Sequence, residues 1–160
     1  MSERLFISKK LTMPRDPLLL ETETYLHEQI PITRAMGVRV ESFDSEKLVI
    51  AAPLAANHNH LGTAFGGSLS AIATLAGYGL LWLELGDRES HIVIKKSSIQ
   101  YRHPVRGEIR AVCKRLDGLE LTAFKSKFQR TGKAGLRLTV TIEEDQRICV
   151  EFQGVFVAIR

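Results

Sequence analysis

A loop rich in Asn, His and Gly runs directly into an uncharged apolar segment near the middle of the chain. The loop covers residues 57–68, and the apolar segment, residues 69–85, carries no charge before Glu84. The first backbone N–H groups of a helix have no partner inside that helix, and the helix dipole is positive there. A Gly-rich loop that leads into a helix therefore predicts a place where an anion or a polarised carbonyl oxygen can bind.

The apolar segment must be buried on all sides if it is a helix, because it has no polar face. Residues 64–83 are a run of 20 uncharged residues, which is about the length that spans a bilayer. However, this stretch contains four Gly, two Ser, one Thr and one Tyr, and no basic cluster flanks it. A central helix in a soluble core is therefore favoured over a membrane span.

Length and composition indicate one ordinary globular domain. The chain has 160 residues, of which 44% are hydrophobic and 25% charged. We expect a flexible leader over residues 1–17 and a single domain over residues 18–160. The two cysteines, Cys113 and Cys149, lie in apolar strand patterns without metal-ligand spacing, which indicates core thiols in a reducing compartment. The N-terminus lacks an apolar run long enough for a secretory signal, so the expected location is the cytoplasm.

Charge is unevenly distributed along the chain. Residues 1–90 hold 8 Lys+Arg against 11 Asp+Glu, whereas residues 91–160 hold 14 against 7. This basic half is either the solvated face of a sheet or a positive rim for a phosphate-bearing or acidic partner. Nucleic acid fits less well, because the chain has no basic tail, basic helix or aromatic–basic repeat.

The periodicity predicts an α+β fold in which a curved antiparallel sheet wraps around the long central helix. A short helix is expected to begin at Asp16–Pro17 and to end at Pro31. The apolar phase changes along residues 91–103, which predicts a β-bulge within residues 95–98. Asp117–Gly118 predicts a type I′ hairpin turn. The expected strands are residues 37–43, 47–52, 91–103, 108–116, 121–130, 136–143 and 147–159.

These features resemble the hotdog fold. The resemblance rests on the pattern N-x-x-G-x-x-x-G-G before an apolar helix, followed by an expected five-stranded antiparallel meander. The string HLGTAFGGSL, with IPIT and MGV upstream and HIVIKKSSIQYRHPV downstream, is similar to one subgroup in particular. This subgroup comprises thioesterase-like domains that occur alone, or behind an acetyltransferase-like domain, in proteobacteria. The resemblance covers residues 18–160.

The resemblance implies an enzyme of acyl thioesters held on coenzyme A or acyl carrier protein. It also implies a dimer, or a dimer of dimers, with an acyl tunnel along the subunit interface. The family's loop Asn falls on Asn59 and its Gly-Gly pair on Gly66 and Gly67. However, Phe65 occupies the place of the usual His, and Thr74 occupies the place of the usual carboxylate. The hydroxyl of Thr74 does not ionise near neutral pH, so it cannot act as a general base.

Two reactions fit these residues, and a third interpretation needs no reaction. In hydrolysis, Asn59, Thr74 or Ser68 would orient a water, with His58 or His60 as the base. In decarboxylation of a malonyl thioester, the N–H donors and Asn59 would hold the enolate, while Thr63 or Ser68 would orient the departing carboxylate. The absence of the carboxylate is also consistent with a non-catalytic module that binds acyl thioesters.

The remaining candidates each have a functional and a structural interpretation. His58 and His60 form an H-x-H pair without a third ligand, so we predict no metal and no cofactor. Asn59 could serve only as a loop cap, Phe65 is expected to line the tunnel, and Tyr78 and Trp82 are expected in the core. A basic set near the expected dimer strand could grip coenzyme A phosphate or an acidic carrier helix, or could form a solubilising rim. This set is Lys95, Lys96, Arg102, His103 and Arg106.

Overall fold

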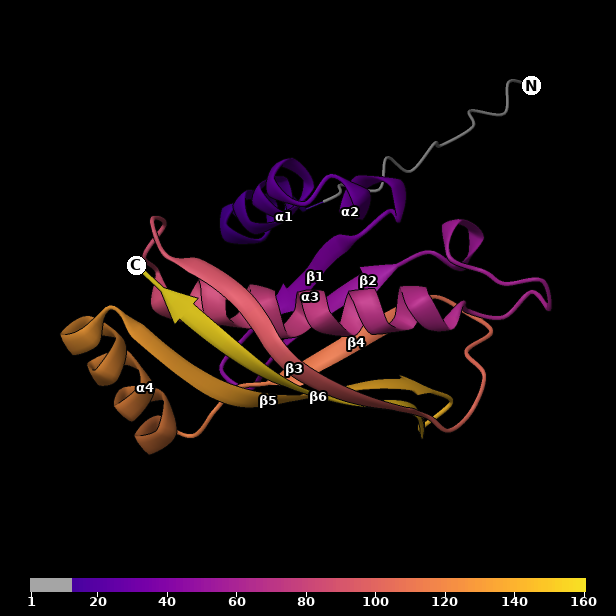
Figure 1. Cartoon of the computed structure of the whole chain (residues 1–160). Coiled ribbons are helices and arrows are strands. Elements are labelled where there is room, and N and C mark those ends of the chain that lie inside the picture. The colour runs from indigo at the N-terminus through magenta and orange to yellow at the C-terminus, as the bar shows by residue number, and fades with distance from the viewer. Residues whose placement is uncertain (1–12) are drawn as a thin grey trace, which may run out of the picture.

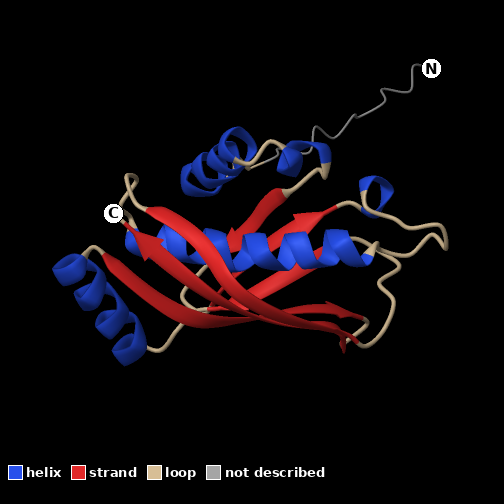
Figure 2. Cartoon of the chain, viewed as in Figure 1, coloured by secondary structure: helices blue, strands red, loops and turns tan. Residues whose placement is uncertain are grey.

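A computed structural model describes residues 13–160, and it shows one curved antiparallel sheet wrapped around a long helix (Figures 1 and 2). The six strands pair in the order β1-β2-β4-β5-β6-β3. This arrangement is the predicted hotdog fold. The strands are β1 Arg39–Phe43, β2 Lys47–Ala52, β3 His91–Tyr101, β4 Ile109–Lys114, β5 Lys133–Glu144 and β6 Arg147–Ile159.

The central helix α3 spans Gly66–Leu85, so it begins inside the stretch that we expected to be loop. It contacts β2, β3, β4, β5 and β6, which confirms that it is the core helix of the fold. Its length and composition alone would suit a membrane span, but 61% of its most apolar window is buried inside the domain. Helix α3 ends at Gly86, which adopts the left-handed conformation with φ of 62°.

Within the described residues, two helices precede the sheet in the chain, and the first of them packs against β1 and α3 (Figure 1). They are α1, Pro17–Gln29, and α2, Ile32–Ala35. The predicted start of α1 is confirmed, because the Asp16 side chain accepts a hydrogen bond from Leu18 N at 2.9 Å. Residues 1–12 of the expected leader lie outside the described residues, and Pro17 already belongs to α1.

An aromatic contact ties α1 to α3. The rings of Tyr25 and Trp82 stack with centroids 4.6 Å apart, and the hydroxyls of Tyr25 and Tyr78 lie 3.1 Å apart. Burial raises the pKa of Tyr78, and the hydrogen bond with Tyr25 adds to this effect. Trp82 and Tyr78 therefore belong to the core, as predicted.

The predicted bulge lies at Lys95 on β3. The pairing of β3 with β6 shifts register between Ile94 and Lys96, so one extra residue enters β3. This strand occupies one edge of the sheet, and β1 occupies the other.

One predicted strand and one predicted turn are wrong. Residues 121–130 lie in helix α4, Gly118–Thr131, instead of a strand, and Asp117 caps this helix by accepting from Glu120 N at 2.8 Å. Phe124 and Phe128 suggested a strand face, but a spacing of four residues also fits one helix face. Asp117–Gly118 is therefore a helix start, and the chain after α3 forms four strands and a helix instead of a five-stranded meander.

A two-residue hairpin turn does occur between β5 and β6. Glu144 pairs with Arg147, and the intervening Asp145 and Gln146 have φ of 52° and 61°. Positive φ at both central residues is the signature of a type I′ turn. Cys113 and Cys149 are both buried, and burial raises the pKa of the Cys113 thiol to about 12.

Candidate functional site

The loop before α3 folds back on itself as a short hairpin. Phe65 N donates to Asn57 O at 2.7 Å, and His58 and Ala64 form an isolated antiparallel bridge. The buried side chain of Asn57 anchors the base, because its Nδ2 donates to Met36 O and Pro53 O, both at 2.8 Å. The hairpin therefore fixes where the chain enters α3.

Asn59 and Thr63 lie together at the tip of this hairpin. Asn59 Oδ1 accepts from Leu61 N at 2.9 Å and from Thr63 N at 3.2 Å, while Nδ2 donates to Thr63 Oγ1 at 3.0 Å. The Asn59 amide thus stabilises its own loop. Asn59 lies two residues after Asn57, which pairs with Phe65 at the base of the hairpin. The tip is therefore roughly 7 Å along the hairpin from Phe65, the residue that precedes α3.

The first turn of α3 offers unused backbone donors. Within residues 13–160, the N–H groups of Gly66, Gly67 and Ser68 have no hydrogen-bond acceptor, and Phe65 provides no side-chain cap. The ring of Phe65 lies against Gly67, where an added Cβ would come within 2.4 Å of Cε1. Phe65 is 56% exposed, so it covers the helix start from outside and is not packed in the core.

A cleft of 250 Å³ lies at this helix start. Tyr101 closes one side, with its ring 3.6 Å from the position of a Cβ on Gly66 and its hydroxyl donating to Gly66 O at 3.2 Å. Ala64 N donates to Val105 O at 2.8 Å, which ties the loop before α3 to the loop after β3. The cleft is lined by Ala64, Gly66, Leu69, Tyr101, Arg102, His103 and Pro104.

No described acidic residue lines this cleft. Thr74, at the position of the family carboxylate, donates from Oγ1 to Ser70 O at 2.8 Å within α3. The carboxylate of Glu84 is buried and bonded to Arg115, with Lys125 3.8 Å away. Glu84 also lies eighteen residues beyond Gly66, about 27 Å along the helix, so it cannot act at the cleft.

The two predicted loop histidines do not line the cleft. His58 and His60 are both exposed, and His58 Nδ1 lies 2.9 Å from Asn59 O. The histidine that lines the cleft is His103. No group of three or more metal-ligating side chains occurs among residues 13–160.

The predicted basic set is divided in space. Lys95 and Lys96 lie in the middle of β3, whereas Arg102 follows its end and lines the cleft. Arg102 forms a hydrogen bond from Nε to Glu151 at 2.6 Å. The backbone N–H of Arg106 donates to Glu144 at 2.9 Å, in the loop that leads to β4.

The contribution of Tyr101 to the cleft was not predicted from the sequence. The sequence did contain a hint, because Ile99 and Tyr101 are two residues apart and therefore share the face of β3 that points toward α3. The contact with Gly66 joins residues 35 positions apart, so no local pattern could reveal it.

A curved antiparallel sheet wrapped around one long helix defines a protein of the hotdog fold. The chain belongs to the family described as "Putative thioesterase (yiiD_Cterm)", whose sequence model matches residues 19–160.

Solved structures show the same relationship. A putative thioesterase from Shewanella oneidensis is 32% identical, with a TM-score of 0.83 over 91% of this chain and 100% of that chain. A Chlorobaculum tepidum protein of unknown function is 31% identical, with a TM-score of 0.83 over 89% of this chain and 94% of the other. A probable thioesterase from Pseudomonas aeruginosa is 25% identical, with a TM-score of 0.73 over 92% and 97% of the two chains.

Proposed function

We propose that this protein hydrolyses acyl thioesters of coenzyme A or acyl carrier protein at the start of α3. The observation that carries this proposal is the set of unpartnered N–H groups on Gly66 and Gly67, beside the cleft that Gly66 lines. Donors at a helix N-terminus stabilise the negative charge that develops on a carbonyl oxygen when water adds to it. Collapse of this intermediate would break the C–S bond and release a free acid and a thiol.

His103 is our candidate for the proton acceptor in hydrolysis. It lines the cleft, whereas His58 and His60 do not, and no carboxylate is present there. In this role His103 would take a proton from the attacking water and later return one to the leaving thiolate. Asn59 would act indirectly, because its side chain holds the tip of the hairpin that leads into α3.

A second candidate function is the decarboxylation of a malonyl thioester, and the lining of the cleft favours it. In the part of the chain that the structure describes, no acidic side chain lines the cleft, whereas His103 and Arg102, the latter paired with Glu151 outside the lining, do line it. This lining suits a substrate that carries its own carboxylate. The C–C bond to that carboxylate would break, its electron pair would form an enolate, and the Gly66 and Gly67 donors would hold the enolate oxygen. Protonation at carbon would then give an acetyl thioester and CO2. A non-catalytic acyl-binding module is the third alternative.

We further propose that the working protein is a cytoplasmic homodimer joined through β3, with a tetramer as a further alternative. Strand β3 is an edge strand of 11 residues, and Val93 and Ile94 on it are 47% and 39% exposed. A long exposed edge with apolar side chains is a template for pairing with a second strand. Pairing there would place the second copy beside the strand that supplies Tyr101 to the cleft.

The test is to remove one N–H donor without breaking the helix. Gly66 is the first residue of α3, where proline is tolerated, and Phe65 has the extended conformation that proline requires of its predecessor. We expect Gly66→Pro to lower kcat by about 10²- to 10³-fold, as the loss of an oxyanion donor does. Gly66→Ala is the matched control, because it keeps the N–H and its Cβ would meet only the Tyr101 ring at 3.6 Å.

The assay should offer acyl and malonyl thioesters on both coenzyme A and carrier protein. Release of free acid and thiol identifies hydrolysis, whereas CO2 and an acetyl thioester identify decarboxylation. A folded Gly66→Pro protein that turns over these substrates as fast as Gly66→Ala would refute the proposed donor. If the native protein turns over none of them but binds them, the binding-module alternative gains support.

A further inference from the structure

The bulge on β3 presents two consecutive lysines on the outer face of the sheet, away from α3. Lys96 pairs with Val155 of β6, and Lys95 lines a hollow together with Val155 and Val157. In a regular strand, consecutive side chains point to opposite faces, so the extra residue is what allows both to lie outside.

Lys95 belongs to a basic shelf, and Lys96 lies beside it. We define the basic shelf by Lys95, Lys127, Lys133 and Arg137. The hollow that they line measures 680 Å³ and includes the apolar residues Val155 and Val157. Within residues 13–160, no acidic side chain lines this hollow, and none of its three lysines forms an ion pair. Four cations without counter-charges around an apolar floor favour a polyanionic ligand with an apolar ring.

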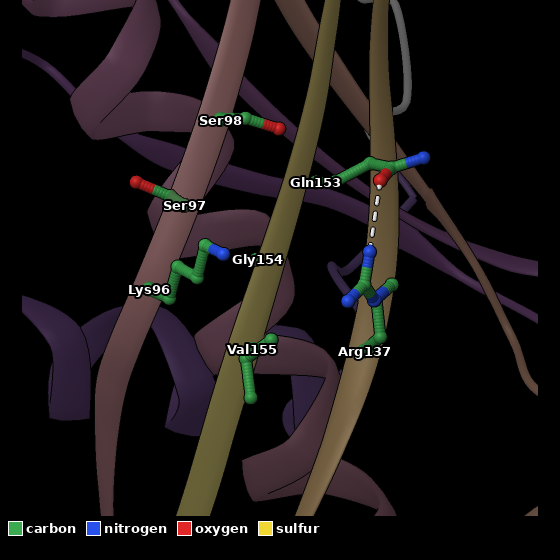
Figure 3. A pocket seen from close by; sticks show the side chains of 7 residues that line it. All are labelled: Lys96, Ser97, Ser98, Arg137, Gln153, Gly154 and Val155. Carbon is green, nitrogen blue, oxygen red and sulfur yellow. Dashed lines mark hydrogen bonds between the residues drawn. The ribbon is translucent and has the colours of Figure 1, made fainter.

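Between the basic shelf and the cleft at Gly66 lie two further hollows, and each hollow shares lining residues with the next. The shelf shares Arg137 and Val155 with a small hollow around Lys96, whose lining Figure 3 shows. That hollow shares Ser98 and Gln153 with the next one, which has a volume of 300 Å³. Arg102 belongs both to this third hollow and to the Gly66 cleft.

The connecting segment is neutral and polar. We call it the polar track and define it by Ser98, Gln100, Thr139 and Gln153, side chains that can donate and accept hydrogen bonds. Glu151 also lines this hollow, and its carboxylate is bonded to Arg102. Arg102 lies six positions after Lys96 along an extended chain, so this part of the path is roughly 20 Å long.

We propose that the thioester substrate lies along this path, with a phosphorylated nucleotide end on the basic shelf. Its amide-bearing arm would follow the polar track, and its thioester would reach the donors of Gly66. A coenzyme A thioester has this chemistry: phosphates and a flat ring at one end, then amides, then sulfur. The apolar residues Val155 and Val157 on the floor of the shelf suit a flat ring, which favours coenzyme A over a carrier protein surface. This inference rests on the proposed function only for the position of the thioester.

The test reverses two charges of the shelf that lie far from the cleft. In the double variant Lys133→Glu/Arg137→Glu, we expect the KM for an acyl-coenzyme A thioester to rise about tenfold or more. The KM for the same acyl group on N-acetylcysteamine, which has no nucleotide or phosphate, should rise far less. Lys114→Glu is the matched control, because Lys114 is an exposed lysine on β4 and lines a different hollow.

Direct binding of free coenzyme A, measured by titration calorimetry, separates this inference from the proposed activity. We expect at least tenfold weaker binding to the double variant than to Lys114→Glu, whether or not any thioester is turned over. Equal binding to both variants, equal KM shifts for the two substrates, or turnover of carrier thioesters without coenzyme A binding would each overturn the inference. Coenzyme A binding that depends on the shelf, in a protein that turns over no thioester, supports the shelf and refutes only the proposed activity.

Discussion

Two glycines of α3 have different physical roles. Gly66 leaves an N–H group open beside the cleft, whereas Gly77 allows the helix to approach β6 closely. A Cβ on Gly77 would come within 2.4 Å of Phe156 Cζ, and a Cβ on Gly154 would come within 2.6 Å of Phe156 Cε2. The ring of Phe156 is fully buried and lies close to both glycines, so a methyl group added at either position requires this ring to shift.

Gly77→Ala should therefore destabilise the protein while leaving its exposed surface unchanged. We expect a loss of about 1–3 kcal/mol in the free energy of unfolding, as overpacking of a tight core produces. Urea or thermal unfolding measures it. Gly118→Ala is the control, because nothing lies within 4 Å of its added Cβ. Equal stability of the two variants would show that Phe156 can relax after all.

At the residue scale, the sequence predicted free amides at the start of α3 but not the residues that surround them in the candidate site. The run Asn59 to Gly67 is local, so its pattern could place free amides at a helix start. Tyr101, Arg102 and His103 reach the cleft from another strand, and this contact depends on where β3 ends relative to α3. Such long-range placement follows from the folded sheet and has no local signature.

At the element scale, the apolar pattern of residues 121–130 fits the periodicity of both a helix and a strand. Residues 121–130 place Phe124 and Phe128 on one face in either structure. The flanking residues decide the outcome: Asp117 caps the first turn, and Gly132 ends α4 in the left-handed conformation with φ of 72°. The spacing of Leu121, Phe124 and Phe128, at three and four residues, was the available helix signal.

The cap of α4 can be tested directly. Asp117→Ala removes the acceptor for Glu120 N and should cost about 1 kcal/mol of stability. Asp117→Asn keeps a side-chain oxygen and should lose much less. Chemical denaturation of both variants gives the comparison. Equal losses would mean that the charge of Asp117, and not its hydrogen bond, stabilises the helix.

Another prediction at the element scale concerns the contact between α1 and β1. Burial of Glu23 acts to raise its pKa, but hydrogen bonds from Arg15 and Val40 N outweigh burial and hold the pKa below its usual value. The folded state therefore favours the ionised carboxylate. Its stabilisation is present above the unfolded pKa, about 4.3, and is lost as pH falls through the folded pKa.

We expect Glu23→Gln to be less stable than the native protein at pH 7 and to approach it in stability as the pH is lowered below 4. Unfolding by urea at several pH values measures this difference. Glu28→Gln, at an exposed position of the same helix, should show no such convergence. A constant difference for Glu23→Gln across the pH range would contradict the assigned ionisation.

At the scale of the whole molecule, the exposed edge at β3 sets the assembly that we propose. Ile94→Lys places a charge on this edge, and charged residues on edge strands oppose pairing. We expect sedimentation velocity to show a shift from dimer to monomer. Leu119→Lys is the control, because Leu119 is 87% exposed on α4, away from the edge. A native protein that sediments as a monomer would remove the dimer from the proposal.

The hydrogen bond between Tyr101 and Gly66 would connect the proposed assembly to the proposed chemistry. The strand that would recruit the second copy also supplies the phenol that contacts the first residue of α3. Loss of the neighbouring copy would free the end of that strand and loosen the wall of the cleft. Catalytic rate per molecule would then fall on dilution, at the same protein concentration at which the two copies separate.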